Sequence, residues 1–313
     1  MYPYIFQVSL IYFAVFDSFL KFNESDHSYL TKKLTESSIR RVNQYPPMIL
    51  NKLRGLLLQD YHEMWRLVQI MEKFQGKRAL VTGASSGIGR GIALKLASLG
   101  AEVFAVARSE EALKSLEKEH SNIKTFQLDL TDWDKSRKTI ESILPIHLLI
   151  NNAGMNLLAP VLEATPEDFD YSFNLNVKAV MNATQVVTKD LISRKEGGRV
   201  VNISSIAGQR AIQNHLIYCS TKAAVDMLTK CFALELGPHN IRVNAVSPTV
   251  VLTELGRRGW SDPVKANAVK ARIPQGRFVE VEEVVNVVIY LLSDESDMIN
   301  GHSLPIEGGL LIS

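Results

Sequence analysis

A tyrosine and a lysine four residues apart, Tyr218 and Lys222, are the residues of this chain whose types and spacing most directly suggest catalysis. Residues four apart lie on one face of a helix, so the lysine ammonium would reach back toward the phenol. A phenol has a reference pKa of about 10, and a cation held beside it stabilises the phenolate. Ser205, upstream of the pair, adds a hydroxyl donor. Together these residues predict proton transfer to an oxygen atom, although a tyrosine–lysine pair alone also suits an exposed amphipathic helix.

A glycine-rich turn far ahead of these residues predicts a nucleotide site. It reads Gly83-Ala-Ser-Ser86-Gly87-Ile88-Gly89 and lies between an apolar run at 78–82 and a helical pattern at 88–99. The first glycine allows a sharp turn, the second lets the backbone approach a pyrophosphate, and the third allows close packing of helix on strand. Because the next strand candidate, 102–107, completes a βαβ unit, we favour dinucleotide binding over an ordinary turn.

Apolar strand candidates recur along the chain with helical segments between them. They span residues 78–82, 102–107, 124–128, 147–150, 199–204, 241–247 and 303–306. This alternation predicts an α/β fold, a doubly wound parallel seven-stranded sheet (Rossmann fold) in a single domain with helices on both faces. Ligands bind beyond the carboxyl ends of such strands. Polar residues at 151–154, 204–205 and 247–249 all fall at strand ends, which predicts an active site along one rim.

Composition fits one small-molecule enzyme domain. The 313 residues are 46% hydrophobic and carry a net charge of +2, with no block of basic residues that would favour nucleic acid. We expect no metal site. The two cysteines, Cys219 and Cys231, fall in one predicted helix about three turns apart and cannot pair. A reducing, cytoplasmic setting is therefore expected.

Residues 1–70 form an N-terminal extension of uncertain structure ahead of a domain at 71–313. The apolar stretch at 2–16 is shorter than the roughly 20 residues of a membrane span, and neither a basic start nor a small-residue cleavage site is evident. Weak membrane or organelle association stays open as a minor alternative, because residues 53–70 have an amphipathic pattern. The leading explanation is an extension upstream of Met71 from an alternative start.

From about residue 71 to the end, the chain resembles the short-chain dehydrogenase/reductase family. The shared motifs are the glycine turn, Asp129, Asn151-Asn152-Ala153-Gly154, Asn176, Ser205, Tyr218 with Lys222, and Ser247-Pro248-Thr249 with Thr253. Within the family, the chain is most similar to the xylulose and dicarbonyl reductase group. The similarity lies in Asn214-His215, the segments 218–222, 226–230, 233–238 and 248–251, and Trp260-Ser-Asp-Pro263. The resemblance implies an NADPH-dependent carbonyl reductase for small ketoses such as L-xylulose and α-dicarbonyls such as diacetyl. It also implies a homotetramer assembled through helices at 218–236 and 280–292.

The end of the second strand indicates which cofactor is bound. An NAD site usually places an acid there, but this chain has Arg108-Ser109 and no carboxylate before Glu110. A guanidinium and a hydroxyl suit a 2′-phosphate, which favours NADP(H). Related NADP enzymes often have a basic residue where this chain has Ser86, so we expect a weaker preference for NADP(H) over NAD(H). Asp129 resembles the family residue at the adenine, but an N-cap of the following helix is an equal alternative.

The resemblance supplies the remaining cofactor and catalytic residues. The implied cofactor-binding set is Gly83, Ser86, Gly87, Ile88, Gly89, Arg108, Ser109, Asp129, Leu130, Asn152, Ala153, Gly154, Tyr218, Lys222, Pro248, Val250, Val251 and Thr253. Ser205 would hold the substrate carbonyl, Tyr218 would protonate it, and Lys222 would lower the tyrosine pKa and hold the nicotinamide ribose. Ser204 is the alternative serine. Asn176, chosen over Asn174 by its local pattern, would bend a long helix and hold a relay water.

Substrate residues are expected at Ser205, Ile206, His215 and Trp260. His215 and Trp260 match substrate positions of the reductase group, and Trp260 falls in a predicted lid at 254–274, although either residue also suits ordinary packing. Sugar reductases tend to have glutamine where this chain has Ile206, which favours less polar carbonyls. Two alternatives stay open: a 3-oxoacyl-carrier-protein reductase with a basic entrance at Arg257, Arg258 and Lys265, and a non-catalytic nucleotide-sensing scaffold.

Overall fold

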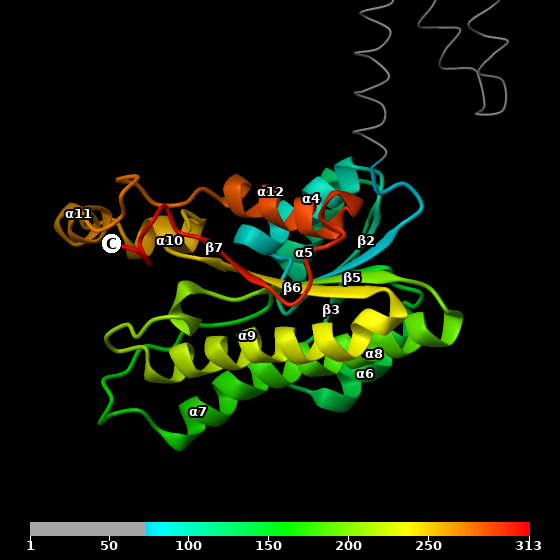
Figure 1. The fold of residues 1–313 in the computed structure, drawn as a ribbon, viewed down its shortest axis with the longest axis horizontal. Helices are drawn as coiled ribbons and strands as arrows, with labels where there is room; N and C mark the ends of the chain where they lie inside the picture. Colours follow the sequence, from blue (N-terminus) through cyan, green and yellow to red (C-terminus); the bar gives the residue numbers. More distant parts are fainter. Residues whose placement is uncertain (1–72) are drawn as a thin grey trace, which may run out of the picture. The chain divides into compact units, whose positions relative to one another are not determined.

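The computed structural model describes residues 73–313, which belong to one compact unit (Figure 1). The expected N-terminal extension, residues 1–70, and its suggested membrane association lie outside the described residues. Within the described part of the chain, no helix combines the length and apolar character needed to cross a bilayer.

Seven parallel strands form one sheet, as predicted. Their order is β3-β2-β1-β4-β5-β6-β7. The strand order therefore reverses between β1 and β4, which is where doubly wound sheets bind ligands. Near-continuous burial of the five central strands explains why they read as apolar runs, whereas the edge strands β3 and β7 are only partly buried. The strands are β1 (Arg78–Thr82), β2 (Glu102–Ala107), β3 (Ile123–Gln127), β4 (Leu148–Asn151), β5 (Gly198–Ile203), β6 (Ile241–Pro248) and β7 (Ser303–Ile306).

Helices cover both faces of the sheet (Figure 1). One face carries α4 (Gly87–Ser98), α5 (Glu110–Glu119) and α12 (Val281–Leu292), packed on an apolar cluster that includes Ile92 and Val288. The other face carries α6 (Trp133–Ser142), α7 (Pro166–Phe173), α8 (Ala179–Arg194) and α9 (Leu216–Leu236), over a second cluster. Short 3₁₀ turns at Ile206–Gly208, Gly237–His239 and Asp294–Ser296 complete the connections.

An irregular turn joins α7 to α8. Residues Asn174–Lys178 form a π-helix, so α7 and α8 are two parts of one long helix with an expanded turn between them. Such turns are rare and concentrate at functional sites. Asn176, predicted to bend a long helix, lies in this turn and is buried.

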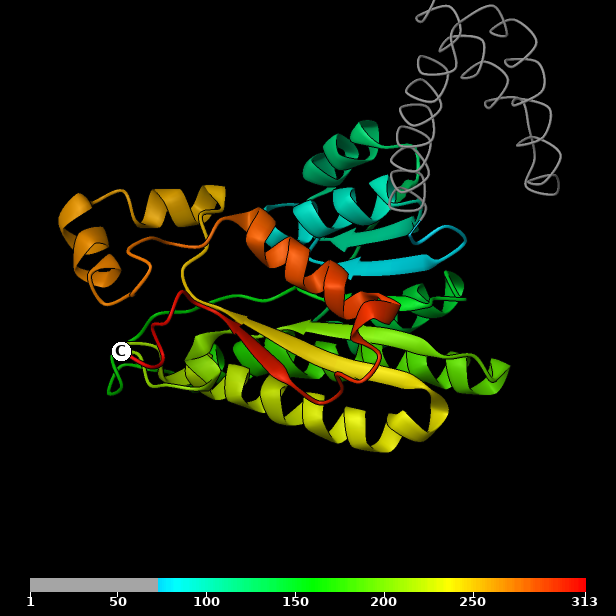
Figure 2. The same ribbon diagram turned by 45° about the horizontal axis from the view of Figure 1, so that its top comes forward.

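Two helices extend beyond the carboxyl ends of the strands, where Figure 2 shows them projecting from the sheet. They are α10 (Glu254–Gly259) and α11 (Pro263–Lys270), and both fall in the predicted lid. Thr253 and Asp262 cap their N-termini by accepting hydrogen bonds from backbone N–H groups. A third apolar cluster, separate from the two under the main helices, joins this segment to the C-terminal residues.

Candidate active site

The glycine turn packs directly against the end of β4. Gly83 has φ +64°, and a Cβ added there would lie 2.8 Å from the Cα of Ala153. A Cβ on Gly89 would lie 2.4 Å from the side-chain amide nitrogen of Asn152 and 2.4 Å from the carbonyl oxygen of Gly83. Real Cβ atoms do not approach so closely, so both positions require glycine. The turn between β1 and α4 is therefore fitted to the strand end predicted to share its ligand.

Hydrogen bonds fix the same two segments to each other. The backbone N–H groups of Asn152 and Ala153 both donate to Oγ1 of Thr82 at 3.0 Å. The side-chain amide of Asn152 donates to the carbonyls of Thr82 at 2.9 Å and Gly83 at 3.1 Å. Asn152 thus holds the glycine turn against the end of β4. Gly154, two residues later, is exposed at the rim.

The N-terminus of α4 is open to a ligand. Ser86 is its exposed N-cap residue and makes no side-chain capping bond. Gly87 has φ +54°, and an added Cβ would lie 2.9 Å from Cγ2 of Thr253. Ile88 packs on the apolar cluster beneath α4. The positive end of the helix dipole and free N–H groups suit the pyrophosphate predicted for this position.

The two residues predicted to bind a 2′-phosphate are exposed at the end of β2. Arg108 donates from Nη1 to the hydroxyl of Tyr171 at 2.8 Å. Ser109 is the N-cap of α5, and its oxygen accepts from the N–H of Ala112. Because capping uses the oxygen as an acceptor, the hydroxyl proton stays free to donate to an anion.

Asp129 does not cap the following helix, so that alternative is wrong. Asp132 caps α6, and Oδ1 of Asp129 instead accepts from the N–H of Thr131 at 2.9 Å and its hydroxyl at 2.8 Å. The backbone hydrogen bond from Thr131 is the main cause that lowers the pKa of Asp129, and the charge of Arg108 contributes. Asp129 is therefore an ionised carboxylate at the rim, and the neighbouring Leu130 is buried.

Tyr218 and Lys222 lie on one face of α9, as predicted, but the ammonium does not meet the phenol oxygen. Nζ of Lys222 lies 5.6 Å from the centroid of the Tyr218 ring and donates to the carbonyl of Ile203 at 2.8 Å. That carbonyl ends β5, so the lysine is held at the rim of the sheet. It leaves two ammonium protons for other partners.

Burial sets the pKa values of this pair. It raises the pKa of the Tyr218 phenol, while the Ser205 hydroxyl acts in the opposite direction. It also lowers the pKa of Lys222 to about 8, partly offset by the carboxylate of Asp226. The expected lowering of the tyrosine pKa by the lysine is not seen: the pKa of Tyr218 is raised, mainly by the cost of burying a phenolate, and the Ser205 hydroxyl is the group that lowers it. Tyr218 is thus a neutral proton donor at neutral pH.

Asn176 connects the π-helix to the catalytic helix. Its side chain accepts from the N–H of Met155 at 2.9 Å and donates to the carbonyl of Met155 at 2.9 Å and the hydroxyl of Thr221 at 3.1 Å. A Cβ added to Gly154 would lie 3.2 Å from Oδ1 of Asn176 and 3.6 Å from Nζ of Lys222. The structure therefore brings Asn176, Gly154 and Lys222 together.

The two neighbouring serines point to different partners. Ser204 is buried, and its hydroxyl donates to the backbone carbonyl of Lys222 at 3.3 Å. Ser205 is only half-buried, its oxygen accepts from the N–H of Ala207 at 3.1 Å, and it acts on the Tyr218 pKa. Ser205 is thus the serine on the phenol side, as predicted.

Comparison with known proteins agrees with this geometry. A family model described as enoyl-(acyl carrier protein) reductase matches residues 83–311. The chain is 52% identical over 238 residues, 76% of its length and 98% of the relative, to L-xylulose reductase from Mesocricetus auratus. It is 49% identical to D-erythrulose reductase from Gallus gallus, covering 77% and 98% of the two chains. Among solved structures, gluconate 5-dehydrogenase from Burkholderia cenocepacia in complex with NADP and tartrate has 31% identity and a TM-score of 0.72, covering 78% and 99%.

The chain belongs to the short-chain dehydrogenase/reductase family. It is an oxidoreductase, so the prediction of an enzyme is confirmed.

In this short-chain dehydrogenase/reductase chain, the last predicted cofactor residues follow β6. Pro248 ends that strand, Val250 packs on the third cluster, and Val251 pairs with Val279 in an isolated bridge. Thr253 caps α10 and lies against Gly87. The segment after β6 is thereby attached to the glycine turn.

The predicted substrate residues separate into two groups. His215, the residue before α9, places its ring edge-on to Tyr218 with centroids 6.1 Å apart, and its Nδ1 is 2.6 Å from the carbonyl of Gln213. Ile206 and Trp260 instead belong to the third cluster, where Trp260 packs on Phe278 at 5.3 Å. Ile206 is 4% exposed, so it supports the lid rather than presenting its side chain to solvent.

Sequence reasoning missed three residues that shape the site. Thr221 accepts from Asn176, Tyr171 accepts from Arg108, and Asp226 acts on Lys222. Asp226 follows Lys222 by the same four residues that separate Tyr218 from Lys222, so the helical spacing could have revealed it. For Tyr171, 63 residues from Arg108, the sequence holds no local signal.

Proposed function

We propose that this chain is an NADPH-dependent carbonyl reductase that acts on small ketoses such as L-xylulose and on α-dicarbonyls such as diacetyl. The observation that carries the proposal is the convergence of Ser205, Tyr218 and Lys222 with the glycine turn along one rim of the sheet. The names of the relatives, L-xylulose reductase and D-erythrulose reductase, support a small ketose as substrate.

The described residues fit NADP(H). Gly83, Gly87 and Gly89 form a turn whose added Cβ atoms would collide with neighbouring atoms, and the open α4 N-terminus suits a pyrophosphate. Arg108 and Ser109 supply an exposed guanidinium and a free hydroxyl proton for a 2′-phosphate. A structural relative with NADP bound supports the same cofactor.

The catalytic residues have distinct tasks in reduction. NADPH held by these residues would supply a hydride for the carbonyl carbon. Ser205 donates a hydrogen bond to the carbonyl oxygen, and Tyr218 transfers its phenolic proton to that oxygen as negative charge develops. Lys222, held by the Ile203 carbonyl, places a positive charge near the phenolate that remains and has protons free for the nicotinamide ribose. Asn176, in the π-helix, lies beside Gly154 and donates to Thr221, the residue before Lys222 on α9.

The structure weakens the case for an acyl-carrier-protein substrate. That alternative needs free basic residues at the entrance, but Arg257 and Arg258 form ion pairs with Glu280 and Glu254. Lys265 lies over the Trp260 ring at 4.6 Å. The two carboxylates offset the charges of Arg257 and Arg258, so of the three cations only Lys265 keeps a charge unpaired within residues 73–313 for an acidic carrier.

A cofactor and carbonyl panel tests the proposal. Turnover is followed by absorbance of the reduced nicotinamide, with L-xylulose, diacetyl and a 3-oxoacyl thioester offered to NADPH and NADH in turn. Wild-type protein is compared with Tyr218→Phe, which keeps the ring and removes the proton. Undiminished turnover in Tyr218→Phe, or a preference for the thioester, would contradict the proposal.

The domain boundary and the assembly belong to the same proposal. Residues 71–313 make the reductase domain, a proposal supported by the two relatives named above, each of which is matched over 98% of its own length by about 240 residues of this chain. A cytoplasmic homotetramer is the expected form. Exposed apolar side chains on α9 (Met227 and Leu234) and on α12 (Tyr290) support interfaces on those helices.

A further inference from the structure

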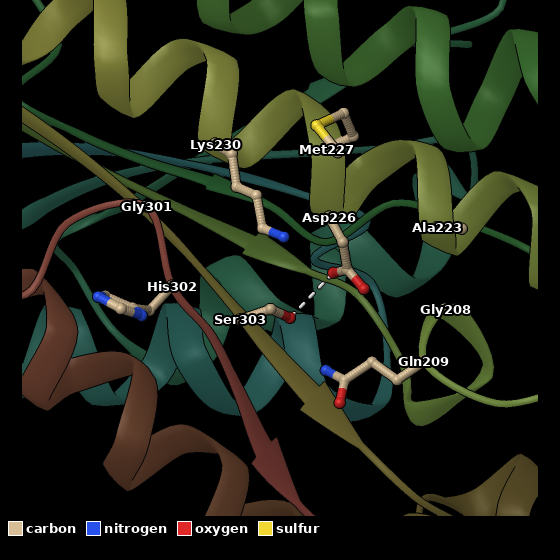
Figure 3. Close-up of a pocket in the computed structure, with 9 residues that line it drawn as sticks. All are labelled: Gly208, Gln209, Ala223, Asp226, Met227, Lys230, Gly301, His302 and Ser303. Atoms are coloured by element: carbon tan, nitrogen blue, oxygen red, sulfur yellow. Dashed lines mark hydrogen bonds between the residues drawn. The ribbon is translucent and has the colours of Figure 1, made fainter.

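A cavity of about 460 Å³ lies beside the helix that carries the catalytic pair. Figure 3 shows its lining, which comes from three places: the turn after β5, the middle of α9 and the start of β7. None of these lining residues belongs to the cofactor or substrate set. Its ionisable side chains are Asp226, Lys230 and His302, and Gln209 and Ser303 add an amide and a hydroxyl.

Asp226 is held firmly in this cavity. Its Oδ1 accepts from the hydroxyl of Ser303 at 2.9 Å, and Ser303 is in turn 2.6 Å from the hydroxyl of Ser247 on β6. A Cβ added to Gly208 would lie 2.6 Å from Oδ2 of Asp226, so the carboxylate lies against that glycine. A half-buried carboxylate with this many fixed neighbours is a feature of the fold rather than a free surface charge.

The same contacts connect Asp226 to Lys222. The added Cβ on Gly208 would also lie 2.9 Å from the backbone carbonyl oxygen of Lys222. Ser204, whose hydroxyl donates to that carbonyl, also lies close enough to the Asp226 carboxylate to lower its pKa. Asp226 lies one helical turn beyond Lys222, so it follows the face of α9 that carries Tyr218 and Lys222.

We infer that Asp226 is a positioning residue of the reductase site, whose fixed negative charge keeps Lys222 in its ammonium form. The inference rests on the proposed function, because a charged Lys222 matters only if that residue assists Tyr218 and binds the cofactor ribose.

The charges around both groups support this role. Lys222 is almost completely buried, and burial lowers its pKa to about 8, while the Asp226 carboxylate raises it. The neighbours of Lys222 on other elements, the Ile203 carbonyl and Gly154, are uncharged. Burial raises the pKa of Asp226, and Ser204, Ser303, Lys222 and Lys230 oppose that rise. Asp226 is thus the anion that favours the charged lysine.

The Asp226→Asn variant keeps the shape of the side chain and removes its charge. In wild-type enzyme, reductase activity should fall on the alkaline side as Lys222 loses its proton. In Asp226→Asn this alkaline limb should move to lower pH by about one unit, because an opposite charge nearby is worth about that much. Asp226→Glu should restore much of the wild-type limb. The matched control is Lys230→Gln, which removes an exposed charge from the same cavity and should shift the limb by less than about 0.3 units.

A second readout needs no turnover. In the cofactor-free protein, the free energy of unfolding should begin to rise with pH once folded Lys222 deprotonates, and this rise should start at lower pH in Asp226→Asn. If the variant fails to fold, ionic strength gives the same test in wild type. Raising salt from about 0.05 to 0.5 M should move the alkaline limb to lower pH, because ions that reach the open cavity screen Asp226.

The inference would be overturned if the alkaline limbs of the pH–activity profiles of wild type and Asp226→Asn coincide. If the variant does not fold, a wild-type alkaline limb that salt does not move would overturn it. A wild-type protein that reduces no carbonyl would instead defeat the proposed function. In that case the unfolding measurement still decides whether Asp226 controls the charge of Lys222.

Discussion

The Arg108 guanidinium donates a 2.8 Å hydrogen bond to the Tyr171 hydroxyl, which ties the end of β2 to α7. This contact holds the guanidinium at the rim through a neutral hydroxyl, which leaves its charge available to a 2′-phosphate. Replacing Arg108 with aspartate should therefore lower kcat/KM for NADPH at least tenfold relative to NADH, since a charge-assisted pair is worth about 1.5 kcal/mol or more. Initial rates with both cofactors measure this ratio, and an unchanged NADPH preference would contradict the assignment.

Tyr171→Phe tests whether the tyrosine orients that arginine. The variant removes one partly exposed hydrogen bond, so we expect KM for NADPH to rise about threefold with kcat and the NADH parameters unchanged. Binding of 2′-AMP and 5′-AMP, measured by calorimetry, provides the control, because only the 2′-phosphate should sense the change. Equal losses for both nucleotides would indicate a general disturbance of the adenine site.

Ser205 and Ser204 should respond differently to alanine. Ser205→Ala removes a donor to the developing oxyanion and should lower kcat about 100-fold. Ser204→Ala loses a buried hydrogen bond to the Lys222 carbonyl and should instead lower the free energy of unfolding by about 1 kcal/mol with kcat nearly retained. Kinetics and urea denaturation on both variants make the comparison, and a larger kcat loss in Ser204→Ala would exchange their roles.

The lowered pKa of Lys222 predicts how stability depends on pH. The folded protein releases this proton near pH 8, whereas the unfolded chain holds it up to about pH 10.4. Between these values the unfolded chain binds more protons, so stability rises with pH. Between pH 7.5 and 9.5, wild type should gain about 2 kcal/mol relative to Lys222→Met. Parallel pH dependence of the two proteins in chemical denaturation would show that Lys222 keeps its ordinary pKa.

Ile206→Gln should destabilise the lid before it improves recognition of sugar hydroxyls. Ile206 is buried in the cluster that contains Trp260 and Phe278, and a glutamine amide there would lack an evident partner. We expect a loss of about 1–3 kcal/mol in the free energy of unfolding and a higher KM for every carbonyl. Ile206→Val, which keeps the site apolar, is the control. A selective gain for L-xylulose over diacetyl without loss of stability would place Ile206 at the substrate after all.

A charged residue on α9 tests the expected tetramer. Leu234 is 80% exposed in the single chain, so Leu234→Glu should break an interface there without harm to the fold. Sedimentation velocity should show a smaller particle than wild type, and Leu255→Glu on α10 serves as a matched exposed control. Identical sedimentation of Leu234→Glu and wild type would remove α9 from the interface.

Features that depend on local sequence could be predicted from it. The seven strands lie where apolar runs alternate with helical patterns, with ends that differ from the predicted ones by at most one residue, as in β3 at Ile123–Gln127. The need for glycine at Gly83 and Gly89 also follows from the turn, and the structure adds which atoms a side chain would strike.

Contacts between distant segments could not be predicted. The rotation of Lys222 toward the Ile203 carbonyl depends on how α9 packs on β5, which no spacing along α9 reveals. The cap of α6 is Asp132 rather than Asp129 because the chain continues for five residues, 128–132, beyond β3 before the helix begins. Burial of Ile206 depends on C-terminal residues about 100 positions away, such as Leu310.

The expanded turn at Asn174–Lys178 makes the enzyme sensitive to chain length at one place. Deleting a single residue there would restore regular helical winding with little rotation of α7 against α8, because a π turn holds one more residue than an α turn. Tyr171 would stay beside Arg108, but Asn176 would move out of its place in the turn and lose its hydrogen bonds to Met155 and Thr221. The deletion would thus impair the proton-relay end of the site and spare the adenosine end, although neither α9 nor β2 had changed.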